Sequence, residues 1–338
     1  MRLTLRRMLI RADTTPQIGT GHVMRCIALA LAAKQIGMGT LLTGYFDVPW
    51  VQERLKKESI PHYCLASDKK HKPESPEEFL EQFKQFSPDC VCLDGYHFDL
   101  TWQTAIIQAG LKLLLIDDYG HLPEYRCNVL LNQNFGAETI QYQGEIGTLL
   151  TGPHYTILRP EFAQARPKVE DRIFKGNAKR LLINLGGGDF SHILPELASI
   201  IEKAMTEKII IRILAGSMPD EVILKAFSAI PVGLEVLRNV RDMPSLLLDT
   251  ELCISATGST TWELCCLGVP FLSLSLAENQ VPVARRLSEE NIAPNITAES
   301  LRTFLYDPQI RARASSRVMG LVDGEGARRV LAGFNCAF

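Results

Sequence analysis

The feature that most constrains the fold of this chain is an alternation of short apolar runs with longer helical stretches, which occurs twice along its 338 residues. This alternation is typical of α/β layers built on mainly parallel sheets. The predicted strands are 8–12, 40–43, 89–93, 111–116, 180–185, 209–214, 235–237, 252–255 and 270–274. Because a polar stretch separates the two series, we predict two successive Rossmann-like units.

These units are expected to be two α/β domains that face each other across a cleft. The N-terminal domain is predicted over 1–160, a linker over 161–178, and the C-terminal domain over 179–338, whose last helix could cross back to the first domain. Domains usually run to about 100–200 residues, which agrees with this division. The charged segment 68–85 is predicted to be an exposed loop and helix without a functional role.

Composition excludes several classes of function. The formal net charge is −2, so no strong basic field favours nucleic acid as a partner. No apolar run reaches the roughly 18 residues that a membrane-spanning helix needs, so no membrane insertion is expected. Residues 1–7 carry charges without the apolar core of a signal peptide, which predicts a cytoplasmic protein.

The nine cysteines do not indicate a metal site, because no CxxC pair occurs among them. Cys90 and Cys92 lie in an apolar run, and Cys26, Cys265 and Cys266 lie in predicted helices. We expect buried free thiols that pack as small apolar side chains.

The first candidate motif is Gly19-Thr20-Gly21-His22-Val23-Met24-Arg25-Cys26, which leads from the first strand into a helix predicted over 23–36. Glycines let backbone approach a ligand, and a helix start offers unpaired N–H groups. The motif differs from the dinucleotide fingerprint, because Met24 replaces the third small residue. A helix N-terminus disfavours imidazolium, so His22 is expected to be neutral and able to accept a proton. The alternative is that His22 only caps the helix.

Two loops of the second half are candidates for binding phosphate. Gly186-Gly187-Gly188-Asp189 follows a strand, and successive glycines form a nest of N–H groups, although a plain tight turn is the alternative. Gly258-Ser259-Thr260 follows another strand and adds donors at a helix start. Glu263 lies near that helix start, where it can accept from ribose hydroxyls or serve only the helix dipole. Together the loops predict a two-sided cradle for a nucleoside diphosphate.

Amides and acids follow other strands. Asn279 and Gln280 come after strand 270–274, where they can bind sugar hydroxyl or acetamido groups, or only cap a helix. Asp94 and the adjacent pair 117–118 end two apolar runs of the first half, at the edge where open α/β sheets bind ligands. The acid pair is a weak candidate for metal binding, and we expect no metal site.

In this order, the motifs resemble the GT-B nucleotide-sugar superfamily. They are more closely similar to the UDP-sugar hydrolases of pseudaminic acid biosynthesis, which act on UDP-2,4-diacetamido-2,4,6-trideoxy-β-L-altropyranose. The resemblance covers most of the chain, and the strings that carry it are Ile10-Arg11-Ala12-Asp13, 19–26, Leu131-Asn132-Gln133-Asn134, Gly152-Pro153, Leu158-Arg159-Pro160-Glu161-Phe162, 185–189, 258–263, Leu267-Gly268-Val269-Pro270 and Asn279-Gln280. The string from Gly21 to Cys26 is specific, whereas Gly258 to Glu263 is shared with related glycosyltransferases. The chain departs from the pattern at 14–17 and in the long segment 68–85.

The resemblance implies that His22 is the catalytic base. It also implies that Gly187, Gly188, Ser259 and Thr260 bind the diphosphate, Glu263 the ribose, and Tyr96 and Asn279 the sugar. The full set of expected substrate-binding residues is Asp13, Gly21, Arg25, Tyr96, Arg159, Gly187, Gly188, Gly258, Ser259, Thr260, Glu263, Asn279 and Gln280.

The expected reaction is hydrolysis of a UDP-linked diacetamido-trideoxy sugar to free sugar and UDP, with inversion and without a cofactor. Its expected partner is the UDP-sugar alone, bound by a monomer or weak homo-oligomer. Three alternatives stay open: a GT-B glycosyltransferase that uses a UDP-sugar donor, a non-catalytic nucleotide-sugar-binding protein, and a UDP-sugar epimerase.

Overall fold

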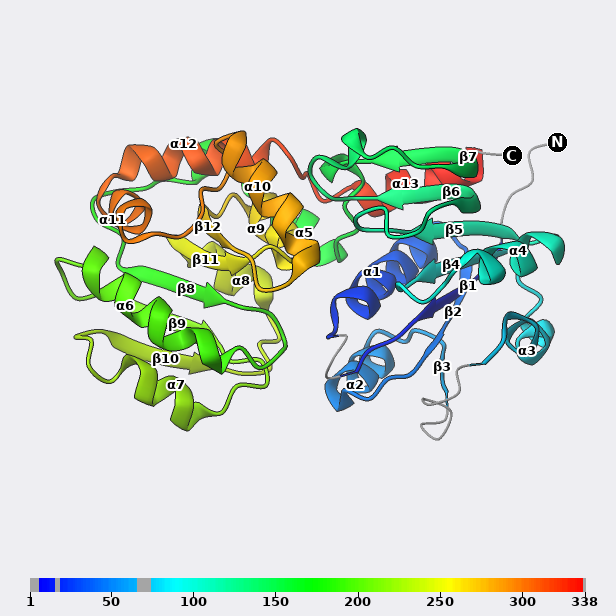
Figure 1. Cartoon of the computed structure of the whole chain (residues 1–338), viewed down its shortest axis with the longest axis horizontal. Coiled ribbons are helices and arrows are strands. Elements are labelled where there is room, and N and C mark those ends of the chain that lie inside the picture. The colour runs from blue at the N-terminus through cyan, green and yellow to red at the C-terminus, as the bar shows by residue number, and fades with distance from the viewer. Residues whose placement is uncertain (1–5, 16–18, 66–73, 337–338) are drawn as a thin grey trace. The chain divides into compact units, whose positions relative to one another are not determined.

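The computed structural model of the chain describes residues 6–15, 19–65 and 74–336 (Figure 1). Three parts of the sequence discussed above lie outside these ranges, namely residues 1–5, Ile18 and residues 68–73 of the charged segment. Internal contacts divide the chain into two compact units, Met1–Pro160 with Gly324–Phe338, and Glu161–Asp323. The stretch expected as a linker therefore falls within the second unit.

The first unit contains a seven-stranded sheet in the order β3-β2-β1-β4-β5-β6-β7, with every neighbouring pair parallel. Its strands are β1 (Arg7–Ala12), β2 (Gly39–Gly44), β3 (His62–Cys64), β4 (Cys90–Asp94), β5 (Lys112–Ile116), β6 (Tyr125–Asn132) and β7 (Gly144–Thr151). The direction of strand addition reverses between β1 and β4, where Ala12 pairs with Asp94. Ligands of open α/β sheets bind at the carboxyl ends of strands at such a reversal.

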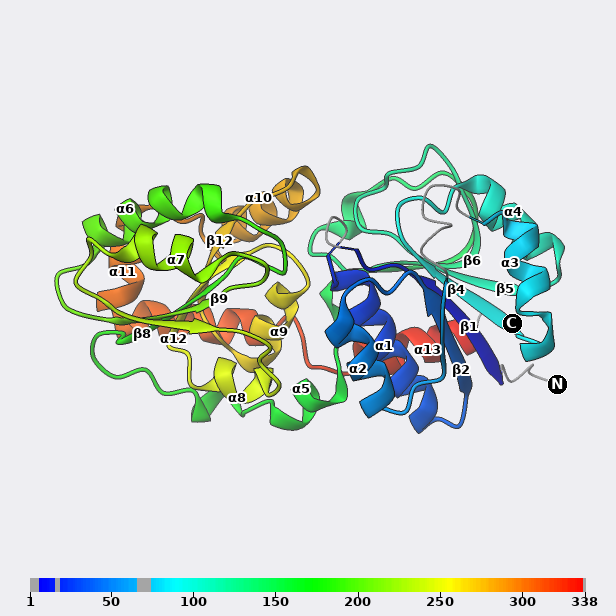
Figure 2. The ribbon, with the colours of Figure 1, turned by 90° about the horizontal axis from the view of Figure 1, so that it is seen from below.

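Helices cover both faces of this sheet (Figure 2). They are α1 (Gly21–Gln35), α2 (Pro49–Lys57), α3 (Pro76–Gln82), α4 (Leu100–Gln108) and α13 (Gly326–Cys336). Side chains alternate along β1, so Met8 and Ile10 pack with α1, α2 and α13, whereas Leu9 packs with α3 and α4. Both faces of the central strands are buried, which explains their nearly continuous apolar sequence.

The second unit repeats the arrangement with five parallel strands in the order β10-β9-β8-β11-β12. These strands are β8 (Arg180–Asn184), β9 (Ile210–Leu214), β10 (Gly233–Leu237), β11 (Leu252–Ala256) and β12 (Phe271–Leu274). Its helices are α5 (Pro160–Ala165), α6 (Leu194–Ala204), α7 (Asp220–Phe227), α8 (Met243–Leu248), α9 (Thr260–Leu267), α10 (Val281–Glu289), α11 (Ala298–Tyr306) and α12 (Pro308–Met319). The reversal lies between β8 and β11.

The predicted α/β class with two mainly parallel sheets is confirmed. The strands β3, β6 and β7 were missed by the sequence analysis. Seven of the nine cysteines are buried as expected, but Cys64 and Cys336 are exposed, so the expectation is wrong for these two. Among the helices of the described ranges, none is both long and apolar enough to cross a bilayer.

Candidate active site

A histidine–aspartate pair lies where the first sheet reverses. His22 is the second residue of α1, and Asp94 is the last residue of β4. His22 Nδ1 lies 2.6 Å from Asp94 Oδ1, and the Asp94 side chain is fully buried. Burial alone would raise the pKa of Asp94, but Arg25 and His22 hold this pKa well below its usual range. Because an ionised carboxylate can only accept, this contact favours the tautomer with its hydrogen on Nδ1, in which the lone pair of the imidazole is on Nε2.

Arg25 joins this pair to a second acid. Its Nε and Nη2 donate to the two oxygens of Asp94, each at 2.6 Å. Its Nη1 and Nη2 donate to Asp118 at 2.7 and 3.0 Å. Burial would raise the pKa of Asp118, but Arg25 lowers it. The guanidinium is therefore held inside the protein, where it orients both carboxylates.

Tyr96 completes this network. Its hydroxyl donates to Asp118 Oδ2 at 2.9 Å, and its ring meets that of His22 edge-on with 5.1 Å between centroids. The structure thus brings together three of the expected site residues, His22, Arg25 and Tyr96. It adds Asp94 and Asp118, which the sequence marked only as acids at strand ends.

Asp13 lies at the same edge, directly after β1. Its Oδ1 accepts from Arg11 Nη1 and from the backbone N–H of Tyr45, the latter at 2.8 Å. His97 Nε2 lies 3.4 Å from Asp13 Oδ2, and burial lowers the pKa of His97. Asp13 therefore lies at the sheet edge in contact with Arg11, Tyr45 and His97.

The charged segment 68–85 contributes to this site, contrary to expectation. Glu74 is buried rather than exposed, because its Oε1 accepts from the buried Arg11 Nε at 2.8 Å. The signal available in the sequence was Arg11 itself, since a charged residue inside an otherwise apolar strand requires a buried partner.

The adjacent acids Asp117 and Asp118 have different partners. Asp117 is fully buried, and burial alone would raise its pKa, but hydrogen bonds, the first from His121, lower it. It accepts from four donors, namely His121 Nδ1 at 2.6 Å, Gly120 N at 2.6 Å, Tyr142 Oη at 2.8 Å and Tyr125 Oη at 3.1 Å. Within the described ranges no three His, Cys, Asp or Glu side chains are grouped so as to hold a metal ion. Asp117 instead fixes the loop that carries Asp118.

The triple-glycine loop follows β8 at the reversal of the second sheet. Gly186 has φ +94°, in the left-handed region, and its N–H donates to Asn184 Oδ1 at 3.1 Å. Gly187 is exposed and Gly188 partly so. Gly216, two residues after the end of β9, packs against this loop, since a Cβ there would lie 2.7 Å from Gly186 O. Sequence reasoning missed Gly216, although a glycine just past a strand was its signal.

The second expected loop begins α9, directly after β11. The parallel register places Ser255 of β11 opposite Asn184 of β8, so the two loops lie beside each other. The side chain of the N-cap Ser259 makes no capping hydrogen bond, and a Cβ at Gly258 would meet nothing within 4 Å. Glu263 is in the first turn of α9 and is partly buried. The expected cradle residues thus share one sheet edge.

The remaining expected residues have varied positions. Gly21 is the first residue of α1, and Arg159 is a buried residue of the first unit. Gln280 Oε1 accepts from the backbone of Leu276 at 2.9 Å, so this amide binds its own loop. The side chain of Asn279 lies outside the described part of the chain.

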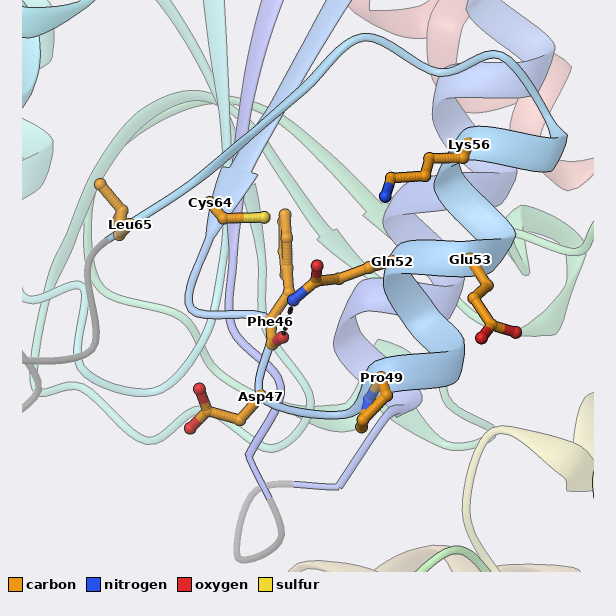
Figure 3. Close-up of a pocket in the computed structure, with 8 residues that line it drawn as sticks. All are labelled: Phe46, Asp47, Pro49, Gln52, Glu53, Lys56, Cys64 and Leu65. Atoms are coloured by element: carbon orange, nitrogen blue, oxygen red, sulfur yellow. Dashed lines mark hydrogen bonds between the residues drawn. The ribbon is translucent and has the colours of Figure 1, made fainter.

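A hollow of about 560 Å³ lies beside α2 and is separate from the His22 network (Figure 3). It is lined by Phe46, Asp47, Pro49, Gln52, Glu53, Lys56, Cys64 and Leu65. Figure 3 shows Gln52 reaching back to the carbonyl of Phe46, a hydrogen bond of 2.8 Å. None of the residues expected to act on substrate lines this hollow, so the candidate active site is the network around His22, Arg25 and Asp94.

Comparison with known proteins agrees with this geometry. No family model matches the chain. MurG of Acinetobacter baumannii has a TM-score of 0.66 over 97% of this chain and 99% of its own, at 17% identity. The chain has the GT-B fold.

Two curated relatives extend the likeness to sequence. The UDP-2,4-diacetamido-2,4,6-trideoxy-beta-L-altropyranose hydrolase of Campylobacter jejuni is 23% identical over 288 residues, 84% of this chain and 97% of the hydrolase. The spore coat polysaccharide biosynthesis protein SpsG of Bacillus subtilis is 24% identical over 341 residues, 96% of each chain. The resemblance predicted from the motifs is confirmed. In sequence and fold the chain is similar to nucleotide-sugar enzymes.

Proposed function

We propose that the chain hydrolyses a UDP-linked diacetamido-trideoxy sugar, UDP-2,4-diacetamido-2,4,6-trideoxy-β-L-altropyranose, to free sugar and UDP in pseudaminic acid biosynthesis. The observation that carries the proposal is the 2.6 Å contact between His22 Nδ1 and the buried Asp94 carboxylate. A histidine held in this way offers Nε2 as a general base, as in other histidine–aspartate pairs. The named resemblance to the Campylobacter hydrolase supports the choice of sugar.

In this mechanism Nε2 of His22 removes a proton from water as the water oxygen attacks the anomeric carbon. The bond from that carbon to the UDP oxygen breaks, and UDP leaves with the bonding electrons. Attack opposite to the leaving group inverts the anomeric centre. Asp94 stabilises the imidazolium that forms, and Arg25 keeps Asp94 ionised and in place.

The leaving UDP is assigned to the second unit. Gly187 and Gly188 provide backbone donors after β8, and Ser259 and Thr260 provide donors at the start of α9. Fixed donors at a helix start stabilise the charge that develops on a departing phosphate. Glu263 is assigned to the ribose hydroxyls. The scheme uses no cofactor or metal ion.

Replacement of the base tests the proposal. We expect His22→Asn to lower kcat by about 10²-fold or more, because general base catalysis typically contributes about 10²–10⁴-fold. The Kd for UDP, measured by calorimetry, should stay within twofold of wild type. His154→Asn is the matched control, since His154 is an exposed histidine of the first unit. A His22→Asn enzyme with near wild-type kcat would remove His22 from catalysis.

The position of bond cleavage tests the reaction itself. Incubation in H₂¹⁸O with a panel of UDP-diacetamido sugars should place ¹⁸O in the sugar and none in UDP, as read by mass spectrometry. Immediate ¹H NMR should show the inverted anomer. UDP release that requires an added acceptor would favour a glycosyltransferase, and binding without turnover would favour a nucleotide-sugar-binding protein.

A further inference from the structure

We propose that Glu74 is a positioning residue that acts through Arg11 on Asp13 and thereby sets how strongly the site binds the sugar. This inference rests on the proposed function. Glu74 immediately precedes α3, and none of the expected site residues comes from that part of the chain. Its role follows from the contacts of four side chains at the carboxyl edge of the first sheet.

The first step is the burial of Arg11. Its side chain is 1% exposed and projects from β1 beside Phe98, which lies in the apolar cluster between the sheet and α3–α4. A guanidinium in such surroundings requires a carboxylate partner. Asp13, directly after β1, contacts this guanidinium and supplies one such carboxylate.

The second step is that the structure supplies a second carboxylate. Glu74 Oε1 accepts from Arg11 Nε at 2.8 Å, and the Glu74 side chain is 3% exposed. Tyr45 closes the network, because its hydroxyl donates to Glu74 Oε2 at 3.2 Å while its backbone N–H donates to Asp13 at 2.8 Å. Arg11 and Tyr45 therefore each contact both acids.

The backbone next to Glu74 is held by the start of α3. The next residue, Ser75, is the N-cap of α3 and forms a capping box with Glu78, with hydrogen bonds of 3.0 and 3.2 Å. This double contact defines the helix start and stabilises it. The carboxylate of Glu74 is thus directed at Arg11 from an anchored backbone.

The consequence is that two acidic side chains share one guanidinium. One guanidinium faces two carboxylates, and burial lowers the pKa of His97, the remaining neighbour that could carry positive charge. Asp13 Oδ1 is occupied by Arg11 and Tyr45, whereas Oδ2 has His97 at 3.4 Å. Because Arg11 is shared, Asp13 stays a strong acceptor for a hydroxyl or acetamido N–H of the sugar.

Glu74→Gln tests this inference, since glutamine retains the shape and the acceptor for Arg11 but removes the charge. We expect KM for the UDP-sugar to rise about tenfold, the effect of one weakened charge-assisted hydrogen bond, with kcat within twofold. The Kd for UDP should be unchanged, whereas the melting temperature should fall, because Arg11 loses one of its two buried charged partners. The control is Glu77→Gln, an exposed acid in the first turn of the same helix. A lower melting temperature with unchanged KM would show a merely structural role and overturn the inference.

A double-mutant cycle tests whether Glu74 acts through Asp13. Asp13→Asn alone and Asp13→Asn combined with Glu74→Gln should give the same KM within twofold. A double variant whose KM rises by the product of the two single fold-changes would overturn the inference. Should Glu74→Gln fail to fold, Tyr45→Phe removes one hydrogen bond to Glu74 but keeps its carboxylate, so it should raise KM by a smaller factor, about two- to threefold. An unchanged KM for Tyr45→Phe would then contradict the proposal.

The failure of the proposed function is distinguishable in the same experiment. Wild-type protein that turns over no UDP-sugar refutes the hydrolase assignment and leaves the Glu74–Asp13 contact to be tested by urea unfolding. In that measurement the changes in the free energy of unfolding caused by Glu74→Gln and by Asp13→Asn should not add up to the change in the double variant. Additive values would overturn the role of Glu74 independently of any activity.

Discussion

The replacement Asp94→Asn separates the charge and the hydrogen-bonding pattern of Asp94 from its shape. In the wild-type network, Asp94 accepts from His22 Nδ1, Arg25 Nε and Arg25 Nη2, each at 2.6 Å. Asparagine offers one oxygen in place of two. If the guanidinium keeps that oxygen, the amide NH₂ faces Nδ1, which must then accept, and the imidazole hydrogen moves to Nε2. The lone pair that would take the water proton is lost.

The size of the effect follows from these contacts. One charge-assisted hydrogen bond to His22 is worth about 1.5–3 kcal/mol. At about 1.4 kcal/mol for each factor of ten, this energy corresponds to about 10–150-fold in rate. Loss of the negative charge beside the imidazolium adds to it, so we expect kcat to fall about 10²–10⁴-fold, where about 10⁴-fold is the loss for the same replacement in a serine–histidine–aspartate triad.

The assay is steady-state release of UDP in water without an acceptor, with the Kd for UDP measured in parallel. Asp118→Asn is the matched comparison, because Asp118 also binds Arg25 but makes no hydrogen bond to His22. It should lose stability to a similar degree and lose kcat by a smaller factor. Equal kcat values for the two variants, or an Asp94→Asn enzyme within threefold of wild type, would refute the reasoning on the tautomer.

Two further predictions follow from other parts of the structure. Gly216→Ala should raise the Kd for UDP, measured by calorimetry, about tenfold or more, because φ is +55° there and the new Cβ would collide with Gly186 O. The control is Gly233→Ala, whose Cβ would lie 3.5 Å from the Ile210 side chain, and it should leave the Kd for UDP unchanged. Acid should destabilise the first unit, because the pKa of Asp118 is lower in the folded protein than in the unfolded chain. The stabilisation that ionised Asp118 provides is fully present above the pKa of the unfolded chain, about 3.9, and is lost as the pH falls through the pKa of the folded protein. Between about pH 5 and pH 2, the free energy of unfolding, measured in urea, should decrease less steeply with falling pH for Asp118→Asn than for wild type. An equally steep decrease would contradict this assignment.

Much of the fold could be predicted because its signal is local. The strands β1, β4, β5, β8 and β11 are buried on both faces, so each is a short apolar run that a single sequence displays. The strand β7 was missed for the opposite reason. The outer strand β7 is mostly exposed and contains Gly144, Gly147 and Glu145, which are unfavourable in strands.

The candidate site was predictable only in part, for a related reason. His22 was found because its glycine context is local, and Asp94 was visible as an acid at a strand end. Their contact depends on β4 lying beside β1 although 72 positions separate the two residues, and no local pattern encodes that neighbourhood. Glu74 was missed because its partner Arg11 is 63 positions away, in a strand whose burial only the sheet reveals.

The return of α13 to the first unit has a consequence for the order of synthesis. Ala327, Val330, Leu331 and Phe334 belong to the same apolar cluster as α1, and Gly326 allows the helix to approach Thr156, since a Cβ there would lie 2.2 Å from the Thr156 carbonyl oxygen. While the ribosome makes residues 161–323, the strands of the first sheet and the helix with His22 have already been synthesised, but α13, which covers part of that core, has not. The unit that is translated first is therefore completed last, after the whole of the second unit has emerged.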